Sequence, residues 1–348
     1  MSSCLLVQSL KEKKIPPILS PYQPADATAW QGDSATFWVE IATPGVPAEY
    51  TYQWYQGSSK LTGATKATYT YTNLPTVGTF TVHCVVSNAA GEVTSRTATL
   101  TVKNPNMTYT YTGGHEKIND GSGNWRIKLK SSGTLKFTNL GKWDGKLDVF
   151  CVGGGCAGGS GYWDAGNGYG KAGSGGYTTT QKSIYATANT AYSIAIGAGG
   201  QSAFAPGGNT SAFGVAAGGG TKLSGGSGGG AYGNREVNNG GSNGGNGDPQ
   251  NAANIGIDHW GSPGKGQGHT TREFGESNST LYAGGGGAGG NGSAQAHGGA
   301  GGGGNGAWNG HPQTSGEENT GGGGGGMYYG LTVLGKGGSG IVVIRNHR

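Results

Sequence analysis

The distribution of glycine constrains the fold of this 348-residue chain more than any other feature. Of the 78 glycines, only six precede residue 104, which leaves 72 for the last 245 residues. This second part therefore uses glycine about four times as often as an average protein. The change is abrupt, so the sequence divides into two regions that must be considered separately.

The overall composition argues against a chain disordered by its charge and against a nucleic-acid-binding protein. Hydrophobic residues make up 33% of the chain, which is low for one large core, and charged residues make up 12%, which is too few for charge-driven disorder. The net charge of +5 is spread along the sequence, and only Lys11, Lys13 and Lys14 are clustered. Because nucleic-acid binding needs a denser basic stripe, we expect no nucleic-acid partner.

The cysteines and the N-terminus indicate where the chain is made. Cys4, Cys84, Cys151 and Cys156 do not form a disulfide framework, and residues 1–20 lack the pattern of a signal peptide. No segment has the 18 or more apolar residues of a membrane span, so we expect no membrane insertion. We therefore expect synthesis in a reducing cytoplasm. If the protein acts outside the cell, we expect its release by a route that needs no signal peptide, such as lysis.

Short alternating segments with turn residues between them predict a β-sandwich in the first region. We expect strands at 34–41, 50–55, 67–71, 79–86 and 96–102. Trp54 stands where immunoglobulin-like domains carry their core tryptophan, and Phe80 replaces the usual corner tyrosine, so residues 16–103 resemble the immunoglobulin-like domains of bacterial surface and phage proteins. Since Cys84 has no cysteine partner in the 34–41 strand, we expect a buried small apolar side chain there.

Apolar β segments bracket the glycine runs of the second region. Alternation predicts strands at 107–112, 124–130, 132–137, 146–152, 177–180, 191–196 and 341–345. From Trp125 to Arg345, the order of Asp148–Gly155, Gly175–Tyr177, Ile196–Gly200, Ser211–Gly214 and Gly337–Arg345 resembles the glycine-rich domain of phage and prophage tail proteins. That resemblance implies parallel polyglycine II helices that stack and carry variable loops.

Polyglycine II is physically suited to such runs. It is left-handed, with three residues per turn and no internal hydrogen bonds, so every N–H and C=O group must bond to a neighbouring segment. The run 321–326 would span about 19 Å at roughly 3.1 Å per residue, and the runs 284–287 and 301–304 would lie beside it. Flexible linkers are the alternative, but linkers seldom end in tyrosine, tryptophan or a strand.

The sequence gives little support for an enzyme. Residues 225–229 match G-x-S-x-G without the strand and helix that the motif needs, and residues 244–248 fall one residue short of a calcium-binding repeat. The histidines are scattered, and no paired carboxylates stand out. We therefore predict no catalytic residues, no metal site and no cofactor.

Aromatic residues between the glycine runs are the candidates for receptor contact. Their rings combine a large apolar area with a polar group, which suits saccharide or protein recognition. Alternatively, they cap the glycine helices as small cores, and the sequence favours neither role for Trp163, Trp260 or Trp308. The candidate contact residues are Tyr162, Trp163, His259, Trp260, Phe274, Trp308 and His311.

Together these observations predict an all-β protein with an N-terminal immunoglobulin-like sandwich and a glycine-rich domain. We expect an anchoring arm (1–15), an immunoglobulin-like domain (16–103), a β-rich lead-in (104–152) and the glycine-rich domain (153–348). The resemblance implies a phage virion protein, a tail-fibre or tail-tip adhesin. Its arm would bind other virion proteins, and its loops would contact a host glycan or protein.

Three other functions compete with the adhesin. A non-adhesive capsid or head-fibre decoration protein is the main alternative, because immunoglobulin-like domains suit that role equally well. A cell-wall glycine-rich protein and a glycan-degrading enzyme follow in that order. A homo-oligomer and a monomer are both compatible with the sequence.

Overall fold

The structure is a computed structural model of an almost entirely β protein. It describes residues 13–164, 167–229, 231–232, 239–240, 261–262, 271–290, 295–308, 310–328 and 333–348, with backbone alone for 161–169 and for the three isolated pairs. The chain divides into two compact units, Met1–Met107 and Thr108–Arg348. Among the described residues the only helical element is the 3-10 turn η2, Glu273–Gly275, so the predicted all-β class is confirmed.

The first unit is a β-sandwich. One sheet has the order β2-β10-β8-β5-β6, with β9 pairing β8, and the pair β3-β7 lies opposite. The predicted single strand at 34–41 is wrong, because the chain changes sheets there: β3 pairs with β7, whereas β4 pairs with β1. The bounds are β1 Ile18–Leu19, β2 Ala27–Trp30, β3 Ala35–Trp38, β4 Ile41–Thr43, β5 Thr51–Gln56, β6 Ser59–Lys60, β7 Thr68–Tyr71, β8 Gly78–Asn88, β9 Gly91–Thr94 and β10 Ala98–Lys103.

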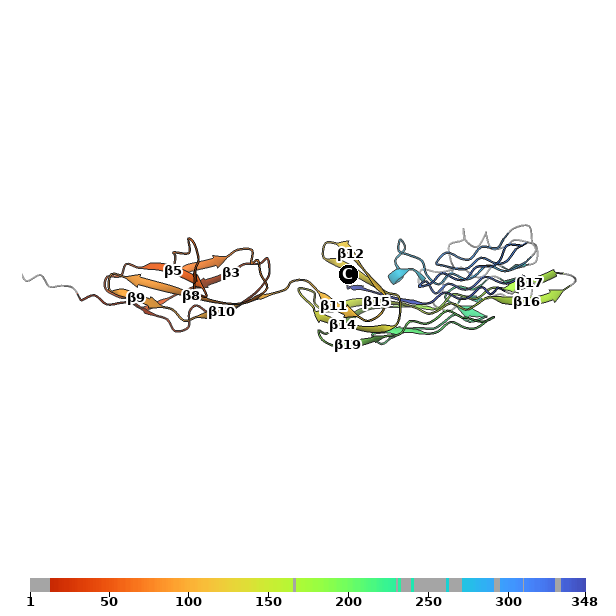
Figure 1. Cartoon of the computed structure of the whole chain (residues 1–348), viewed down its shortest axis with the longest axis horizontal. Coiled ribbons are helices and arrows are strands. Elements are labelled where there is room, and N and C mark those ends of the chain that lie inside the picture. The colour runs from red at the N-terminus through yellow and green to blue at the C-terminus, as the bar shows by residue number, and fades with distance from the viewer. Residues whose placement is uncertain are drawn as a thin grey trace, which may run out of the picture. The chain divides into compact units, whose positions relative to one another are not determined.

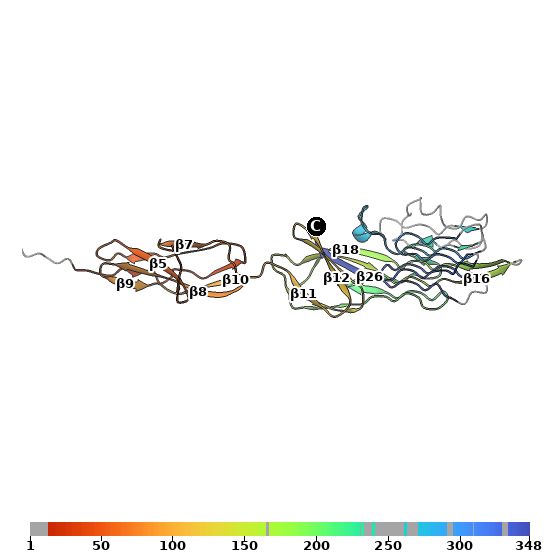
Figure 2. The same ribbon diagram turned by 45° about the horizontal axis from the view of Figure 1, so that its top comes forward.

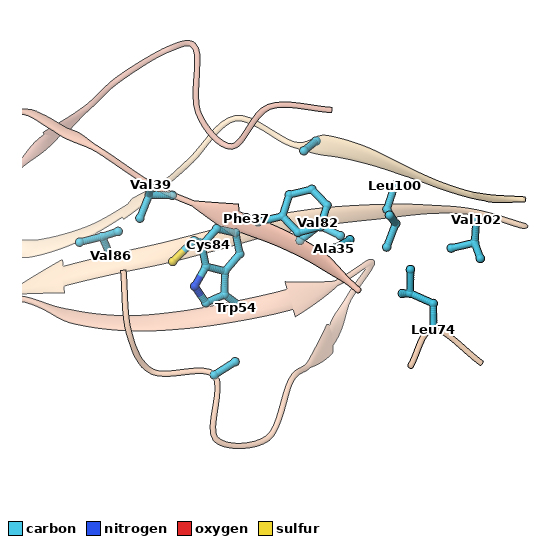
Figure 3. Close-up of a cluster of buried hydrophobic side chains, with 12 residues drawn as sticks. Ala35, Phe37, Val39, Trp54, Leu74, Val82, Cys84, Val86, Leu100 and Val102 are labelled. Carbon is cyan, nitrogen blue, oxygen red and sulfur yellow. The ribbon is translucent and has the colours of Figure 1, made fainter. Parts of the chain in front are cut away.

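Trp54 is at the centre of the core of this unit (Figure 3). Its ring is fully buried, lies 6.4 Å from the ring of Phe37, and donates its Nε1–H to the carbonyl of Lys66 at 2.9 Å. Cys84, directly across from Trp54 in the β5–β8 pair, is fully buried and unpaired. The prediction that Cys84 is a small apolar core side chain is therefore confirmed.

The second unit begins with a smaller sandwich. A three-stranded sheet, β11-β14-β19, packs against a five-stranded sheet, β12-β13-β26-β15-β18, and the rings of Trp125 and Phe137 meet between them at 6.4 Å. The bounds are β11 Thr108–Tyr111, β12 His115–Gly121, β13 Asn124–Leu129, β14 Gly133–Asn139, β15 Lys146–Val152, β18 Thr178–Tyr185, β19 Ala191–Ile194 and β26 Ile341–Asn346. The remaining short strands are β16 Gly159–Asp164, β17 Asn167–Lys171, β20 Thr210–Ala212, β21 Val215–Ala217, β22 Ser224–Gly225, β23 Ala231–Tyr232, β24 Asn239–Gly240 and β25 Gly261–Ser262.

The last strand, β26, connects the two ends of this unit. It lies between β13 and β15 and is antiparallel to both, and its residues Ile341–Ile344 are buried. Within the residues 104–152 that we expected as a separate lead-in, β12, β13 and β15 therefore share a sheet with β26 at the end of the chain, whereas β11 and β14 lie in the three-stranded sheet.

The glycine runs between these strands form what we call the glycine lattice, drawn in Figures 1 and 2 as side-by-side traces next to the strands. Its segments hydrogen-bond sideways to one another instead of forming ladders of strands. They are 153–158, 170–177, 197–200, 205–209, 217–220, 225–229, 283–290, 296–299, 302–307, 313–317, 321–326 and 335–340.

The hydrogen bonds of segment 153–158 show a repeat of three residues. The N–H groups of residues 153–155 donate to carbonyls of 170–177, 205–209 and 335–340, in that order. The N–H groups of residues 156–158 then donate to the same three segments in the same order, at 2.9–3.0 Å. A rotation through three neighbours per turn is the signature of polyglycine II, so this part of the predicted fold is confirmed.

Segment 321–326, which we call the central rod, is surrounded by other lattice segments. All six of its glycines are buried. Within the described part of the chain, it exchanges backbone hydrogen bonds with 153–158, 170–177, 283–290, 302–307, 313–317 and 335–340. Six neighbours around one rod correspond to hexagonal packing. Two of these neighbours overlap the runs 284–287 and 301–304 that we expected beside the rod.

After Gly321, which has a φ of +71°, the central rod needs glycine for space rather than for backbone conformation. Gly322–Gly326 have no positive φ. A Cβ placed on Gly324, however, would lie far closer to the Gly335 carbonyl oxygen than van der Waals contact allows, and Gly322, Gly323 and Gly325 meet similar obstacles. The segments can approach one another closely only because side chains are absent.

We expect Gly324→Ala to destabilise the second unit by about 3 kcal/mol or to prevent its folding, because the methyl group must separate packed backbones. Gly114→Ala is the matched control, since its Cβ would meet nothing closer than the Ser131 Oγ at 3.5 Å. Thermal and urea unfolding of the two variants measure the difference. Equal stability of both variants would contradict the lattice.

Candidate functional site

The lattice has two distinct ends. At the sheet end, segment 153–158 follows β15 directly, segment 170–177 runs into β18, and segment 335–340 runs into β26. At the loop end the chain turns between segments, and in Figures 1 and 2 the hairpin β16–β17 is farthest from the sheets of this unit.

Three backbone bridges bring the loops together at this end. Ser160 pairs with Met327, Gly170 pairs with Gly289, and Gly290 pairs with Trp308. The hairpin that carries Tyr162 and Trp163 is thus adjacent to segments that lead to Trp308 and His311. The structure describes only the backbone of residues 162 and 163, so a contact role for these two side chains stays a prediction.

Trp308 and His311 form a stacked pair in a tight turn. The N–H of Trp308 donates to the His311 carbonyl at 2.9 Å, and the N–H of His311 donates back at 2.6 Å. The turn uses Gly310 at φ +85°, where glycine is favoured. The two rings lie 5.5 Å apart with an angle of 7° between their planes, and His311 is exposed while Trp308 is half-buried. This geometry places two nearly parallel rings at the loop end.

Two further residues at this end were not predicted. Gln313 is 4% exposed, and neither its Nε2 nor its Oε1 has a hydrogen-bond partner in the described structure. An unsatisfied buried amide is costly, so it marks a place where water or a ligand could bond. Phe204 also lies here, since its N–H donates to the Gly158 carbonyl and the Lys222 Nζ lies 4.7 Å from its ring.

Two of the predicted contact residues, His259 and Trp260, lie outside the described residues. Phe274 is described, and its placement corrects our expectation. It is 4% exposed and packs on the five-stranded sheet, with its ring 6.0 Å from that of Phe150. The large Phe274 side chain is accommodated because this glycine-poor stretch packs against a sheet rather than within the lattice. We therefore remove Phe274 from the candidate contact residues.

A charged cavity of about 440 Å³ lies beside Phe274. Arg126 donates to both carboxylate oxygens of Asp120 and, at 2.6 Å, to Glu273. Arg345 lies 3.0 Å from Asp148 and 2.7 Å from Glu276, and its guanidinium lies 4.1 Å above the Phe274 ring. These ion pairs fix the segment around η2 on the sheet.

Ser183, His347 and Asp148 are close together but do not form a catalytic triad. The Ser183 Oγ lies 3.2 Å from Nε2 and 3.5 Å from Nδ1 of His347. An oxygen bonded along the Nε2 lone pair would be much farther from Nδ1, so this serine approaches the ring from the side and is not aligned for proton transfer. Asp148 instead accepts hydrogen bonds from the Ser183 N–H, from Arg345 and from His347.

Other chemistry is not apparent in the described part of the chain. No group of three or more His, Cys, Asp or Glu side chains there could hold a metal. Burial raises the pKa of the Cys84 and Cys156 thiols to about 11 and that of Cys151 to about 12, which disfavours the reactive thiolate. No helix among the described residues is long and apolar enough to cross a membrane.

Each of the two units matches a known sequence family. The sequence model of the family described as "Glycine-rich domain" matches residues 129–347, so the chain belongs to this glycine-rich family. A PKD domain, an immunoglobulin-like module, matches residues 21–102. No curated protein matches. The fibronectin(III)-like modules of Clostridium thermocellum CbhA are similar at 16% identity, over 51% of this chain and 91% of that one, with a TM-score of 0.22.

Acid should destabilise the second unit through Asp148. Burial would raise the pKa of this carboxyl, but hydrogen bonds from His347, Ser183 and Arg345 outweigh burial and hold the pKa below 3.8. The hydrogen bond from Arg345 likewise lowers the pKa of Glu276. Since both folded-state values are depressed, the stabilisation is complete above the unfolded values and is lost as pH falls below about 4.

Thermal unfolding measured between about pH 7 and pH 2 tests this expectation. Asp148→Asn should lower the stability at neutral pH and reduce the loss on acidification. The exposed Glu318→Gln is the matched control and should behave like the unmodified chain. A wild-type acid profile in the Asp148 variant would show that this cluster does not determine the pH dependence.

Proposed function

We propose that the chain is a phage virion protein, a tail-fibre or tail-tip adhesin whose loop end contacts the host surface. The observation that carries the proposal is the convergence of the loops at one end of the lattice. Backbone bridges hold the hairpin 159–171 and the turn 308–311 beside one another at the end opposite the sheets. An adhesin requires this separation between a fixed scaffold and a variable contact surface.

The chemistry of the loop end supports a contact role. Stacked aromatic rings such as Trp308 and His311 offer apolar area with little conformational entropy to lose on binding, as do the aromatic anchors of protein interfaces. On this proposal the immunoglobulin-like unit is a spacer and residues 1–15 attach it to other virion proteins.

Labelling of particles tests where the protein is located. Gold-labelled antibody against the chain should mark the tail tip or tail fibres of particles released from cells that produce it. Labelling of the head would favour a decoration protein instead. Absence of the chain from purified particles would overturn the virion assignment.

We expect the double variant Trp308→Ala, His311→Ala to weaken binding of the full chain to host cells by at least about tenfold, because alanine removes both rings of the turn. Tyr185→Ala is the matched control, since this exposed aromatic residue lies on β18 rather than at the loop end. Binding is measured with fluorescently labelled protein, and unfolding temperatures confirm that both variants fold. Equal loss of binding in the control would contradict a loop-end contact.

A further inference from the structure

We propose that the charged cavity beside η2 is a second binding site, which takes a neutral saccharide of one or two sugar units. The cavity lies against the five-stranded sheet and not at the loop end, and the inference does not depend on the adhesin proposal. Its volume of about 440 Å³ is within the range of small-molecule sites.

Two charged side chains in the wall of this cavity are buried and held by several partners. Glu273 and Arg345 line it and are 1% and 3% exposed. Glu273 is held by Arg126 and by the hydroxyl of Tyr282 at 3.1 Å, and Arg345 is held by Asp148 and Glu276. Buried charged groups that are fixed by partners form a preorganised surface, so a ligand does not have to order them.

Several polar groups in the cavity have unused bonding capacity. Arg345 bonds through Nε and Nη2, and Arg348 bonds through Nη2, so the Nη1 groups of both have no partner in the described part of the chain. The side chains of Asn278 and Thr280 also line the cavity and make no hydrogen bond with described residues. The cavity thus offers guanidinium, amide and hydroxyl groups to a ligand with several oxygens.

The balance of charge selects the ligand class. Among the residues that line the cavity, Arg126, Arg345 and Arg348 carry three positive charges and Asp120, Glu273 and Glu276 carry three negative charges, so the lining charges cancel. These guanidinium groups are already paired with carboxylates, and an anionic ligand would have to compete with them for the same donors. A neutral saccharide avoids that competition, because its hydroxyls accept from the arginines and donate to the carboxylates.

Ligand-observed NMR on the full chain tests the site. The probes are glucose, galactose, mannose, N-acetylglucosamine, lactose and maltose, compared with glucuronate and inorganic phosphate. We expect at least one neutral sugar to bind, and Asn278→Ala and Arg348→Ala each to weaken it about tenfold, the loss of roughly one hydrogen bond. Ser277→Ala is the matched control, because Ser277 is exposed next to Asn278 but does not line the cavity.

The outcomes separate clearly. Loss of sugar binding in the two cavity variants, with binding kept in the control and in the Trp308→Ala, His311→Ala variant, supports the site. Binding of no neutral sugar, binding of the anions alone, or binding unaffected by the cavity variants would overturn it. The loop-end variant distinguishes this site from the adhesin surface, because it should lose cell binding and keep the sugar.

Discussion

The glycine lattice depends on one interaction, the lateral hydrogen bond between closely packed backbones that consist largely of glycine. A single such bond contributes little net stability, and ordering glycine costs more backbone entropy than ordering any other residue. The lattice is stable because its buried N–H and C=O groups find partners in several neighbouring segments at once. The central rod 321–326 shows this most clearly, since it bonds to segments from 153–158 to 335–340.

The β-sandwich of the second unit supplies the apolar side-chain contacts that the lattice lacks. Segments that consist largely of glycine have little apolar surface to set their register. Their ends must therefore be fixed by strands that carry apolar side chains. β15, β18 and β26 fix this register with fully buried residues such as Phe150 and Val343. The segment around Phe274 packs onto the same face. The ion pairs of Arg126 and Arg345 then close this face against the solvent.

Much of this architecture could be predicted from local sequence, because glycine runs and alternating strands are local signals. Trp54 and Cys84 belong to that group, whereas the lattice is implied only by the resemblance to glycine-rich tail domains, and the sequence indicates just two of the six neighbours of the central rod. The position of Phe274 could not be predicted, since its burial depends on Phe150, which is remote in sequence. Gln313 carries no pattern at all, and the change of sheet between β3 and β4 depends on pairing with strands before and after it.

The geometry of polyglycine II has a mechanical consequence. Its rise of about 3.1 Å per residue is close to the limit of roughly 3.3–3.6 Å for a fully extended chain. A pull along the central rod can therefore lengthen each segment by only about a tenth before covalent geometry resists, while lateral hydrogen bonds to six neighbours share the load in shear. A module built this way transmits tension between its two ends with little extension.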